Sequence, residues 1–201
     1  MSEDAKSRRD ENSEATRLAL LAAARELLGT HGYNGTSIEM VASAARVTTG
    51  AIYYHFQNKK DLFQATAEAL QEELLKEATA VSGANTWERL RAGYDLMLER
   101  HSNSAVHRIL FVEAPQVLGP ALSREIAVRY GYGTLREVLR ILIAKNVVRD
   151  FPVRLVARVL LGLLRESSAE LAESGGDPQV RAKVTELVDR VFGAIRVDKG
   201  V

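Results

Sequence analysis

Residues 36–56 have the sequence TSIEMVASAARVTTGAIYYHF, and this stretch decides how the rest of the chain is interpreted. Thr36 and Glu39 have the spacing of a capping box, in which a hydroxyl and a carboxyl bond the free backbone N–H groups at a helix start. Ile38, Val41 and Ala42 then recur at helical spacing and give this helix one apolar face. The pattern breaks soon afterwards, so we expect a short helix followed by a turn.

A second short helix follows the break. Thr48 is a suitable N-cap, and the helix it opens extends to about Tyr54. Two short helices joined by a tight turn form a helix-turn-helix unit, whose second helix can lie in the major groove of DNA. Thr49 lies in its first turn and is our candidate for base recognition, because threonine can bond a base edge or touch a thymine methyl group. Gly50 allows close approach to a phosphate, which the free N–H groups of the helix start also favour.

The stretch resembles the DNA-binding domain of the tetracycline-repressor-type (TetR) family of bacterial transcription regulators. The resemblance spans about residues 15–69 and implies that Tyr54 and His55 point toward phosphate. Arg46 stands where such proteins usually have glycine in the turn. A left-handed backbone there would cost arginine about 1–2 kcal/mol, or Arg46 contacts phosphate, and the sequence leaves both open. The residues that carry the resemblance, in order and without gaps, are Thr36, Val41, Ala42, Ala45, Val47, Thr48, Gly50, Ile52, Tyr53, His55, Phe56, Lys59 and Leu62.

Two lysines begin the next helix, which extends from Lys59 to about Thr79 behind an Asn58 cap. A helix start prefers acidic side chains, so Lys59 and Lys60 indicate phosphate contacts, with an exposed charged cap as the alternative. Ile52 and Phe56 are expected to seal the small bundle instead. The predicted DNA contacts are Thr36, Ser37, Arg46, Thr48, Thr49, Gly50, Ala51, Tyr53, Tyr54, His55, Lys59 and Lys60.

The composition is that of an ordinary globular chain, with 46% hydrophobic and 26% charged residues over 201 positions. The net charge of +1 does not by itself indicate a nucleic-acid binder. There is no cysteine, which excludes disulfides and thiolate metal sites. No apolar run approaches the ~18–20 residues of a membrane span, and the N-terminus lacks the apolar core of a secretory signal. Together with the family resemblance, which implies a bacterial protein, these observations lead us to expect a cytoplasmic protein without a membrane partner, associated with the nucleoid when bound to DNA.

The helical pattern continues to the C-terminus without a convincing strand, so we predict an all-α fold of about nine helices. Its first part would be a three-helix, homeodomain-like helix-turn-helix domain, and its second a helical bundle for ligand binding and dimerisation. Gly32 is expected just past the end of the first helix. The predicted divisions are a disordered tail at 1–13, a DNA-binding domain at 14–60 with its motif at about 37–56, a connecting helix and break at 61–84, and an effector-binding and dimerisation domain at 85–201.

The second domain shows no sequence motif of an enzyme. It contains no His-Glu-x-x-His site, no Gly-x-Ser-x-Gly turn and no glycine-rich phosphate loop, so we predict no catalytic residues, no metal and no cofactor. Pockets between bundle helices tend to be apolar with a few polar anchors. A stripe with that chemistry is more often plain core, and the candidate residues here are Met97, His101, Ile109, Phe111, Glu113 and Tyr130.

The last two helices have apolar faces that suit assembly, and the family resemblance implies that such a pair packs against its twin in a four-helix bundle. The predicted dimer residues are Val156, Leu160, Gly162, Leu163, Leu164, Leu187, Val191 and Ile195. A symmetric dimer would meet a palindromic operator on double-stranded DNA. We predict a ligand-responsive dimeric repressor whose small-molecule effector the sequence does not name. The alternatives are a DNA-architectural or adaptor protein without an effector, and a helical enzyme or ligand carrier with a vestigial DNA-binding domain.

Overall fold

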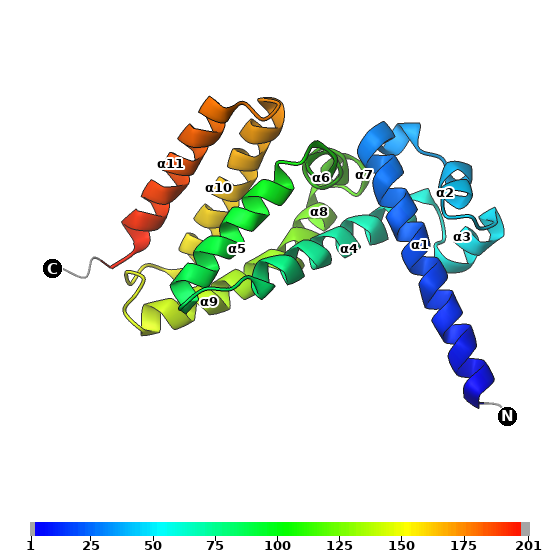
Figure 1. Cartoon of the computed structure of the whole chain (residues 1–201), viewed down its shortest axis with the longest axis horizontal. Coiled ribbons are helices and arrows are strands. Elements are labelled where there is room, and N and C mark those ends of the chain that lie inside the picture. Colours follow the sequence, from blue (N-terminus) through cyan, green and yellow to red (C-terminus); the bar gives the residue numbers. More distant parts are fainter. Residues whose placement is uncertain (1–2, 198–201) are drawn as a thin grey trace. The chain divides into compact units, whose positions relative to one another are not determined.

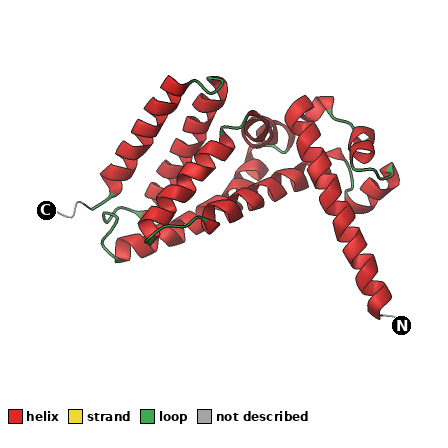
Figure 2. Cartoon of the chain, in the orientation of Figure 1, coloured by secondary structure: helices red, strands yellow, loops and turns green. Residues whose placement is uncertain are grey.

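The computed structural model describes residues 3–197, and every regular element in this range is helical (Figure 2). Val148 and Arg196 form an isolated antiparallel bridge, which is too short to count as a strand. The predicted all-α class is therefore confirmed. The chain divides into two compact units. The first, here the N-terminal unit, holds the residues up to Leu70 together with Arg108–Ser123, and the C-terminal unit holds Gln71–His107 and the residues from Arg124.

The N-terminal unit begins with α1 (Glu3–Gly35), against which α2 (Ile38–Ala44) packs, followed by α3 (Thr49–His55) and the first part of α4 (Lys59–Ala80). Figure 1 shows these elements in blue to cyan. The unit is completed by the π-helical turn η1 (Arg108–Glu113) and by α7 (Ala114–Val117), with the start of α8 (Pro120–Ala127). The sequence order gave no indication that the segment at 108–123 groups with the first unit.

The start of α1 corrects the predicted tail. Residues 1–13 were expected to be disordered, whereas α1 begins at Glu3, and Met1 and Ser2 lie outside the described residues. The segment contains neither glycine nor proline, and its Glu, Lys, Arg and Ala residues have high helix propensity. A charged segment of that kind can extend the apolar helix that follows it. At the other end, Gly32 has non-helical angles (φ 72°, ψ 175°), as expected for a residue at which the first helix breaks.

The C-terminal unit contains the second part of α4, then α5 (Thr86–His101) and α6 (Ser104–His107), and after the end of α8 it continues through the π-helical turn η2 (Val128–Tyr132) into α9 (Gly133–Ala144). The chain ends in a helical pair, α10 (Val153–Glu173) and α11 (Pro178–Ile195), which pack against each other (Figure 1). α10 also contacts α5 and α9, so it is the central helix of the unit. Its core contains Leu139, Leu160 and Val188, all fully buried, together with Tyr94 and Phe192, whose rings meet edge to face.

Candidate DNA-binding surface and effector cavity

The turn between α2 and α3 is a Schellman motif that closes α2. The Arg46 N–H donates to the Ser43 carbonyl and the Val47 N–H donates to the Ala42 carbonyl, as the motif requires. Arg46 occupies its left-handed position with φ 57°, and its side chain is exposed. The turn therefore does hold an arginine where glycine would be unstrained. Exposure also leaves the guanidinium available to a phosphate, so the conformation and the predicted contact are compatible.

α3 keeps one side in the core and exposes the other. The Thr48 hydroxyl accepts a hydrogen bond from the Ala51 N–H at 3.3 Å, which confirms the predicted N-cap. Ile52 is fully buried, and Phe56, just after the helix, is 3% exposed. Tyr53 and Tyr54 are 59% and 78% exposed, so two large aromatic side chains of α3 are accessible to a partner. Thr49 and Gly50 are exposed at its N-terminal end, as a base-reading and phosphate-facing turn requires, and Ala51 and His55 are half-buried.

The start of α4 carries the two predicted phosphate-binding lysines. Lys60 is exposed, whereas Lys59 is half-buried, with its ammonium 4.3 Å from the centre of the Tyr33 ring. This cation–π contact ties Lys59 to α1 and leaves Lys60 as the freer charge. The Asn58 side chain accepts from the Asp61 N–H, and the Asp61 carboxylate accepts from the Gln57 N–H. Asn58 and Asp61 thus accept hydrogen bonds from each other's side of the helix start, and Asp61 is the acidic side chain that a helix start prefers.

Thr36 is the predicted DNA contact that the structure places out of reach. It is 3% exposed, and its hydroxyl donates to the Gly32 carbonyl at 2.8 Å. The cap of α2 is instead Ser37, whose hydroxyl oxygen accepts from the Met40 N–H and whose hydrogen bond to Glu39 lowers the pKa of that carboxyl. Two adjacent hydroxyl residues precede the helix, and sequence spacing alone did not tell which one caps it. Ser37 is half-buried and remains a predicted contact.

A pair of polar contacts fastens η1 to the end of α1 within the N-terminal unit. The Arg108 guanidinium donates to the carbonyls of Gly29 and Thr30, which are among the last of the regular α1 helix. A Glu113 carboxylate oxygen accepts from the Tyr33 N–H at 2.8 Å, immediately after the non-helical Gly32. A Cβ atom at Gly32 would lie 2.5 Å from that oxygen and would displace the Glu113 carboxylate, and the positive φ of this residue favours glycine. Glu113, which was predicted to contact the effector, instead bonds the backbone of Tyr33 within the N-terminal unit.

The C-terminal unit contains a cavity of about 310 Å³ between α4, α5, η2, α9 and α10. This volume lies at the lower end of the range for small-molecule sites. α5 supplies six of the fifteen lining residues, at helical spacing from Thr86 to Met97. The full lining is Leu75, Ala78, Thr79, Thr86, Arg89, Leu90, Gly93, Tyr94, Met97, Gly131, Thr134, Leu135, Val138, Leu161 and Leu164.

Only one of the predicted effector residues lines this cavity, namely Met97. Ile109, Phe111 and Glu113 belong to the N-terminal unit, and Tyr130 is not part of the lining although Gly131 beside it is. His101 is 3% exposed and also lies outside the lining. Burial, with a smaller contribution from nearby His107, lowers the pKa of His101 to about 4, so this side chain is neutral near pH 7.

The sequence predicted only Met97 of this cavity lining, but one residue of α5 could have indicated more of it. Gly93 is a poor helix former in the middle of α5, which marks a place where another backbone approaches closely. A Cβ atom there would lie 2.6 Å from the Ala78 carbonyl oxygen of α4. Thr86, Arg89, Leu90 and Gly93 share that helix face, so the glycine would have selected the correct side of α5.

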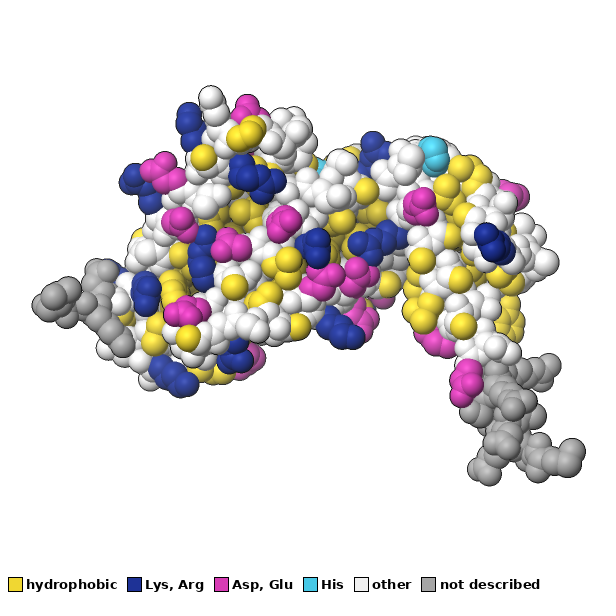
Figure 3. All heavy atoms as spheres, viewed as in Figure 1, with side chains coloured by type: hydrophobic (Ala, Val, Ile, Leu, Met, Phe, Trp, Pro, Cys, Tyr) yellow, Lys and Arg dark blue, Asp and Glu magenta, His cyan; other side chains and the backbone are white. Residues whose placement is uncertain are grey.

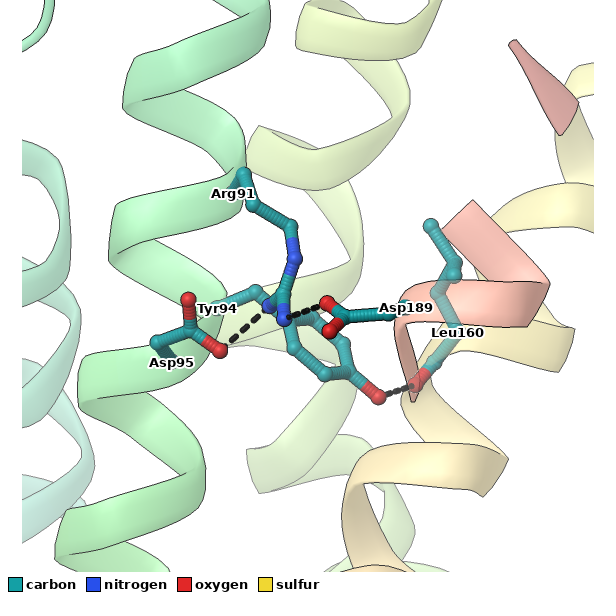
Figure 4. Close-up of polar contacts among 5 residues, drawn as sticks. All are labelled: Arg91, Tyr94, Asp95, Leu160 and Asp189. Atoms are coloured by element: carbon teal, nitrogen blue, oxygen red, sulfur yellow. Dashed lines mark hydrogen bonds and ion pairs between the residues drawn. The ribbon is translucent and has the colours of Figure 1, made fainter. Parts of the chain in front are cut away.

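Polar contacts on the opposite side of α5 hold the helices of the C-terminal unit together (Figure 4). The Arg91 guanidinium pairs with Asp95 on its own helix and with Asp189 of α11 at 2.6 Å. Burial is the main cause that raises the pKa of Asp95, against the opposing effect of Arg91. The Tyr94 hydroxyl donates to the Leu160 carbonyl of α10 at 2.9 Å, and burial raises the pKa of this phenol. Arg91 and Tyr94 thus fix α5 to α11 and α10, and Tyr94 is also part of the cavity lining.

The predicted dimer residues divide between the core and the surface. Val156, Leu160, Leu164 and Ile195 are buried in the core of their own chain, so they are not available to a second copy in this conformation. Gly162, Leu163 and Val191 are half-buried, and Leu187 is 51% exposed. Two exposed apolar residues of α10 that were not predicted, Leu155 and Val159, are 57% and 50% exposed. On the face drawn in Figure 3, basic and acidic side chains are interspersed over the C-terminal unit, with apolar side chains between them.

Comparison with known proteins relates both parts of the chain to one family. Residues 20–66 match the family described as bacterial regulatory proteins of the tetR family, and residues 87–195 match the tetracyclin repressor-like C-terminal domain. The probable acrEF/envCD operon repressor of Escherichia coli (strain K12) is 27% identical over 92% of this chain and 89% of its own length.

Two solved structures extend the likeness to the whole fold. A tetR-family transcriptional regulator from Pectobacterium atrosepticum is 26% identical, with a TM-score of 0.75 over 94% of this chain and 97% of that one. NalD of Pseudomonas aeruginosa, described as the secondary repressor of the MexAB-OprM multidrug efflux pump, is 26% identical, with a TM-score of 0.63 over 94% and 100% of the two chains. Within residues 3–197, none of the helices has the length and apolar character needed to cross a membrane.

Proposed function

Since the chain belongs to the tetR family of bacterial regulatory proteins, we propose that it is a dimeric repressor which a small molecule releases from a palindromic operator. As a member of that family, the chain is a DNA-binding transcriptional regulator. The observation that carries the proposal is the exposed face of α3, where Thr49, Tyr53 and Tyr54 project beside a buried Ile52. In this role the protein works by binding and not by catalysis, in the compartment that holds the chromosome.

The DNA contacts follow from what α3 and its neighbours expose. Thr49 reads a base edge, the helix start and Gly50 approach a phosphate, and Arg46 and Lys60 supply positive charge. Ser37, Thr48, Ala51, Tyr53, Tyr54, His55 and Lys59 complete the proposed contact set. Since few charges are involved, the affinity should fall with salt less steeply than in proteins that neutralise many phosphates.

The dimer we propose uses the outward face of the last two helices. On α10 this face carries Leu155, Val159 and Leu163, which are spaced four residues apart, and on α11 it carries Leu187 and Val191. Three of these side chains, Leu155, Val159 and Leu187, are exposed, and exposed apolar side chains on adjacent helices favour burial against a second copy. Replacing Val159 and Leu187 by glutamate should leave a folded monomer that binds operator DNA far more weakly. Light scattering and circular dichroism would measure this, and a double variant that stays dimeric would contradict the proposed face.

The cavity favours an effector-responsive regulator over an architectural protein without an effector. A solvent-open cavity of about 310 Å³ with mostly apolar walls leaves apolar surface in water unless a ligand covers it. α4 lines this cavity with Leu75 and Ala78 and begins in the N-terminal unit at Lys59, so one helix belongs to both units. A ligand and DNA that favour different positions of that helix would be coupled, typically by about 1–3 kcal/mol.

The experiment that tests the proposal is to map the DNA bound by the protein and then to measure binding to that site in solution. We expect a palindromic site bound by a dimer. Thr49→Ala should change the preferred base at one position of each half-site, with about 1–3 kcal/mol lost in discrimination. Lys60→Ala is the matched control, since a phosphate contact should weaken binding to all sequences alike. An unchanged base preference in Thr49→Ala would exclude Thr49 as the reader.

A further inference from the structure

The cavity of the C-terminal unit has a single charged side chain among otherwise apolar and neutral residues. Among the described residues that line it, Arg89 is the one ionic group, and none is Asp or Glu. The other polar side chains are three threonines and Tyr94, whose hydroxyl is already bonded to the Leu160 carbonyl. The cavity therefore has the polarity of a site for a molecule that is mostly apolar and negatively charged at one end.

Arg89 differs from its neighbour Arg91 in how its charge is satisfied. Arg91 lies on the other side of α5 and pairs with Asp95 and Asp189 (Figure 4). Within the described part of the chain, Arg89 forms no ion pair. It is exposed, and it lies on the helix face of Thr86, Leu90 and Gly93, which faces the cavity. A guanidinium at the rim of an apolar cavity can bond a carboxylate with two parallel N–H groups while the apolar part of the ligand stays inside.

The size of the cavity limits the ligand. A volume of about 310 Å³ corresponds to about ten molecules of liquid water at roughly 30 Å³ each. That is room for a compact molecule of about ten non-hydrogen atoms. Acids as small as acetate would leave most of the apolar wall uncovered, and so would gain little from burial.

We propose that this cavity binds a medium-sized amphipathic carboxylate, with its apolar part between α4, α5, α9 and α10 and its carboxylate on Arg89. The inference deepens the proposed function, because it names the chemical class of the effector for the same site. It rests on the composition of the cavity and on the charge of Arg89. Its test is direct binding to the purified full chain and needs no DNA.

Octanoate is a suitable probe, since it joins a carboxylate to an apolar chain of about the required size, and 1-octanol is its uncharged counterpart. Calorimetry should show octanoate binding at least tenfold more tightly than 1-octanol, and acetate not binding. Arg89→Gln should weaken octanoate binding at least tenfold and leave 1-octanol unchanged. Arg181→Gln, which removes an exposed arginine of α11 outside the cavity, is the matched control and should change neither.

A second variant locates the apolar part. Met97→Trp places a larger side chain in the cavity and should abolish binding of both probes while the thermal unfolding temperature is kept. Equal affinity for octanoate and 1-octanol, or an unchanged octanoate affinity in Arg89→Gln, would overturn the inference. So would full octanoate binding by a folded Met97→Trp variant.

The failure of this inference can be told apart from the failure of the proposed function. If octanoate binds through Arg89 but operator DNA is not released, the ligand class stands and the regulatory role of the cavity falls. If octanoate does not bind while an uncharged molecule releases the DNA, the proposed function stands and the carboxylate assignment falls.

Discussion

Arg46 offers a quantitative test of how the helix-turn-helix turn is built. It holds the left-handed position of a Schellman motif at φ 57°, where an L side chain costs about 1–2 kcal/mol. The same motif recurs in the C-terminal unit at the end of α9, where Asn146 has φ 53° and the Asn146 and Val147 N–H groups bond the Ile143 and Leu142 carbonyls. Asparagine adopts this conformation more readily than arginine does. The two turns are therefore a matched pair that differ in strain.

The expected gain from Arg46→Gly is small but measurable. Glycine removes the strain of about 1–2 kcal/mol, and its greater freedom in the unfolded chain returns about 0.5–1 kcal/mol. The Arg46 side chain is exposed, so little packing is lost. The net stabilisation should be about 0.5–1 kcal/mol, which raises the unfolding temperature by about 1–4 °C in a chain of 201 residues. Asn146→Gly should give a gain near zero.

The control variant is Arg46→Ala, which removes the charge but keeps the Cβ atom that causes the strain. Denaturant and thermal unfolding of the four proteins would separate the effects, and the order of stability should be Arg46→Gly above wild type, with Arg46→Ala and Asn146→Gly close to wild type. If Arg46→Gly were no more stable than Arg46→Ala, the strain argument would be wrong.

The same variants decide whether Arg46 also contacts phosphate. Loss of one phosphate contact per protomer should weaken DNA binding in both Arg46→Gly and Arg46→Ala and reduce the salt slope by about 0.9 per protomer, or about 1.8 for the dimer. A guanidinium that only occupies the turn would leave the slope of both variants at the wild-type value. If Arg46 has both roles, Arg46→Gly should be more stable than wild type and bind DNA more weakly. Arg46→Ala should bind DNA more weakly without a gain in stability.

Three further variants test the interior contacts. The folded protein keeps His101 neutral with a pKa of about 4, whereas the unfolded chain takes up this proton near pH 6.5, so stability should fall by about 3 kcal/mol as the pH drops from about 6.5 to about 4. Denaturant unfolding of His101→Leu across that range should show most of this dependence gone. Gly93→Ala should lower stability by about 1–3 kcal/mol, because its Cβ would press on the Ala78 carbonyl oxygen, and an unchanged midpoint would argue against the close approach. Glu113→Ala leaves the Tyr33 N–H without its acceptor, at about 1–3 kcal/mol, and hydrogen exchange at Tyr33 should become faster.

Features fixed by local chemistry could be predicted from the sequence. Thr48 and Asn58 cap the helices they were expected to cap, because each precedes its helix and accepts from a backbone N–H three residues on. The position of α3, the second helix of the helix-turn-helix unit, was predicted for the same reason, because its start is capped and its apolar residue Ile52 is buried. Thr36 shows the limit of this reasoning: with Ser37 beside it, packing against α1 decided which hydroxyl became buried.

Features that depend on contacts between distant segments could not be predicted. Glu113 looked like a polar group at the end of an apolar run, and nothing local connects it with Tyr33, eighty positions earlier in the chain. The cavity was missed for a related reason. Its walls come from five separate elements, and an apolar residue such as Leu90 or Val138 has the same pattern whether it faces a cavity or a filled core.

α10 shows how a sequence pattern can select a stripe of residues that the structure buries in the core of the same chain. Its apolar residues form two adjacent stripes, Val156–Leu160–Leu164 and, one residue earlier in each turn, Leu155–Val159–Leu163. The first stripe is buried in the core of its own chain, and two of the three residues of the second are at least half exposed. α10 packs against several helices of its own unit, yet most of the second stripe still lies in water, which is a liability unless something covers it. The second apolar stripe of α10 therefore supports a partner such as a second copy of the chain. Because Val156, Leu160 and Leu164 are buried, the stripe available to that partner is the one with Leu155 and Val159, which the sequence pattern did not select.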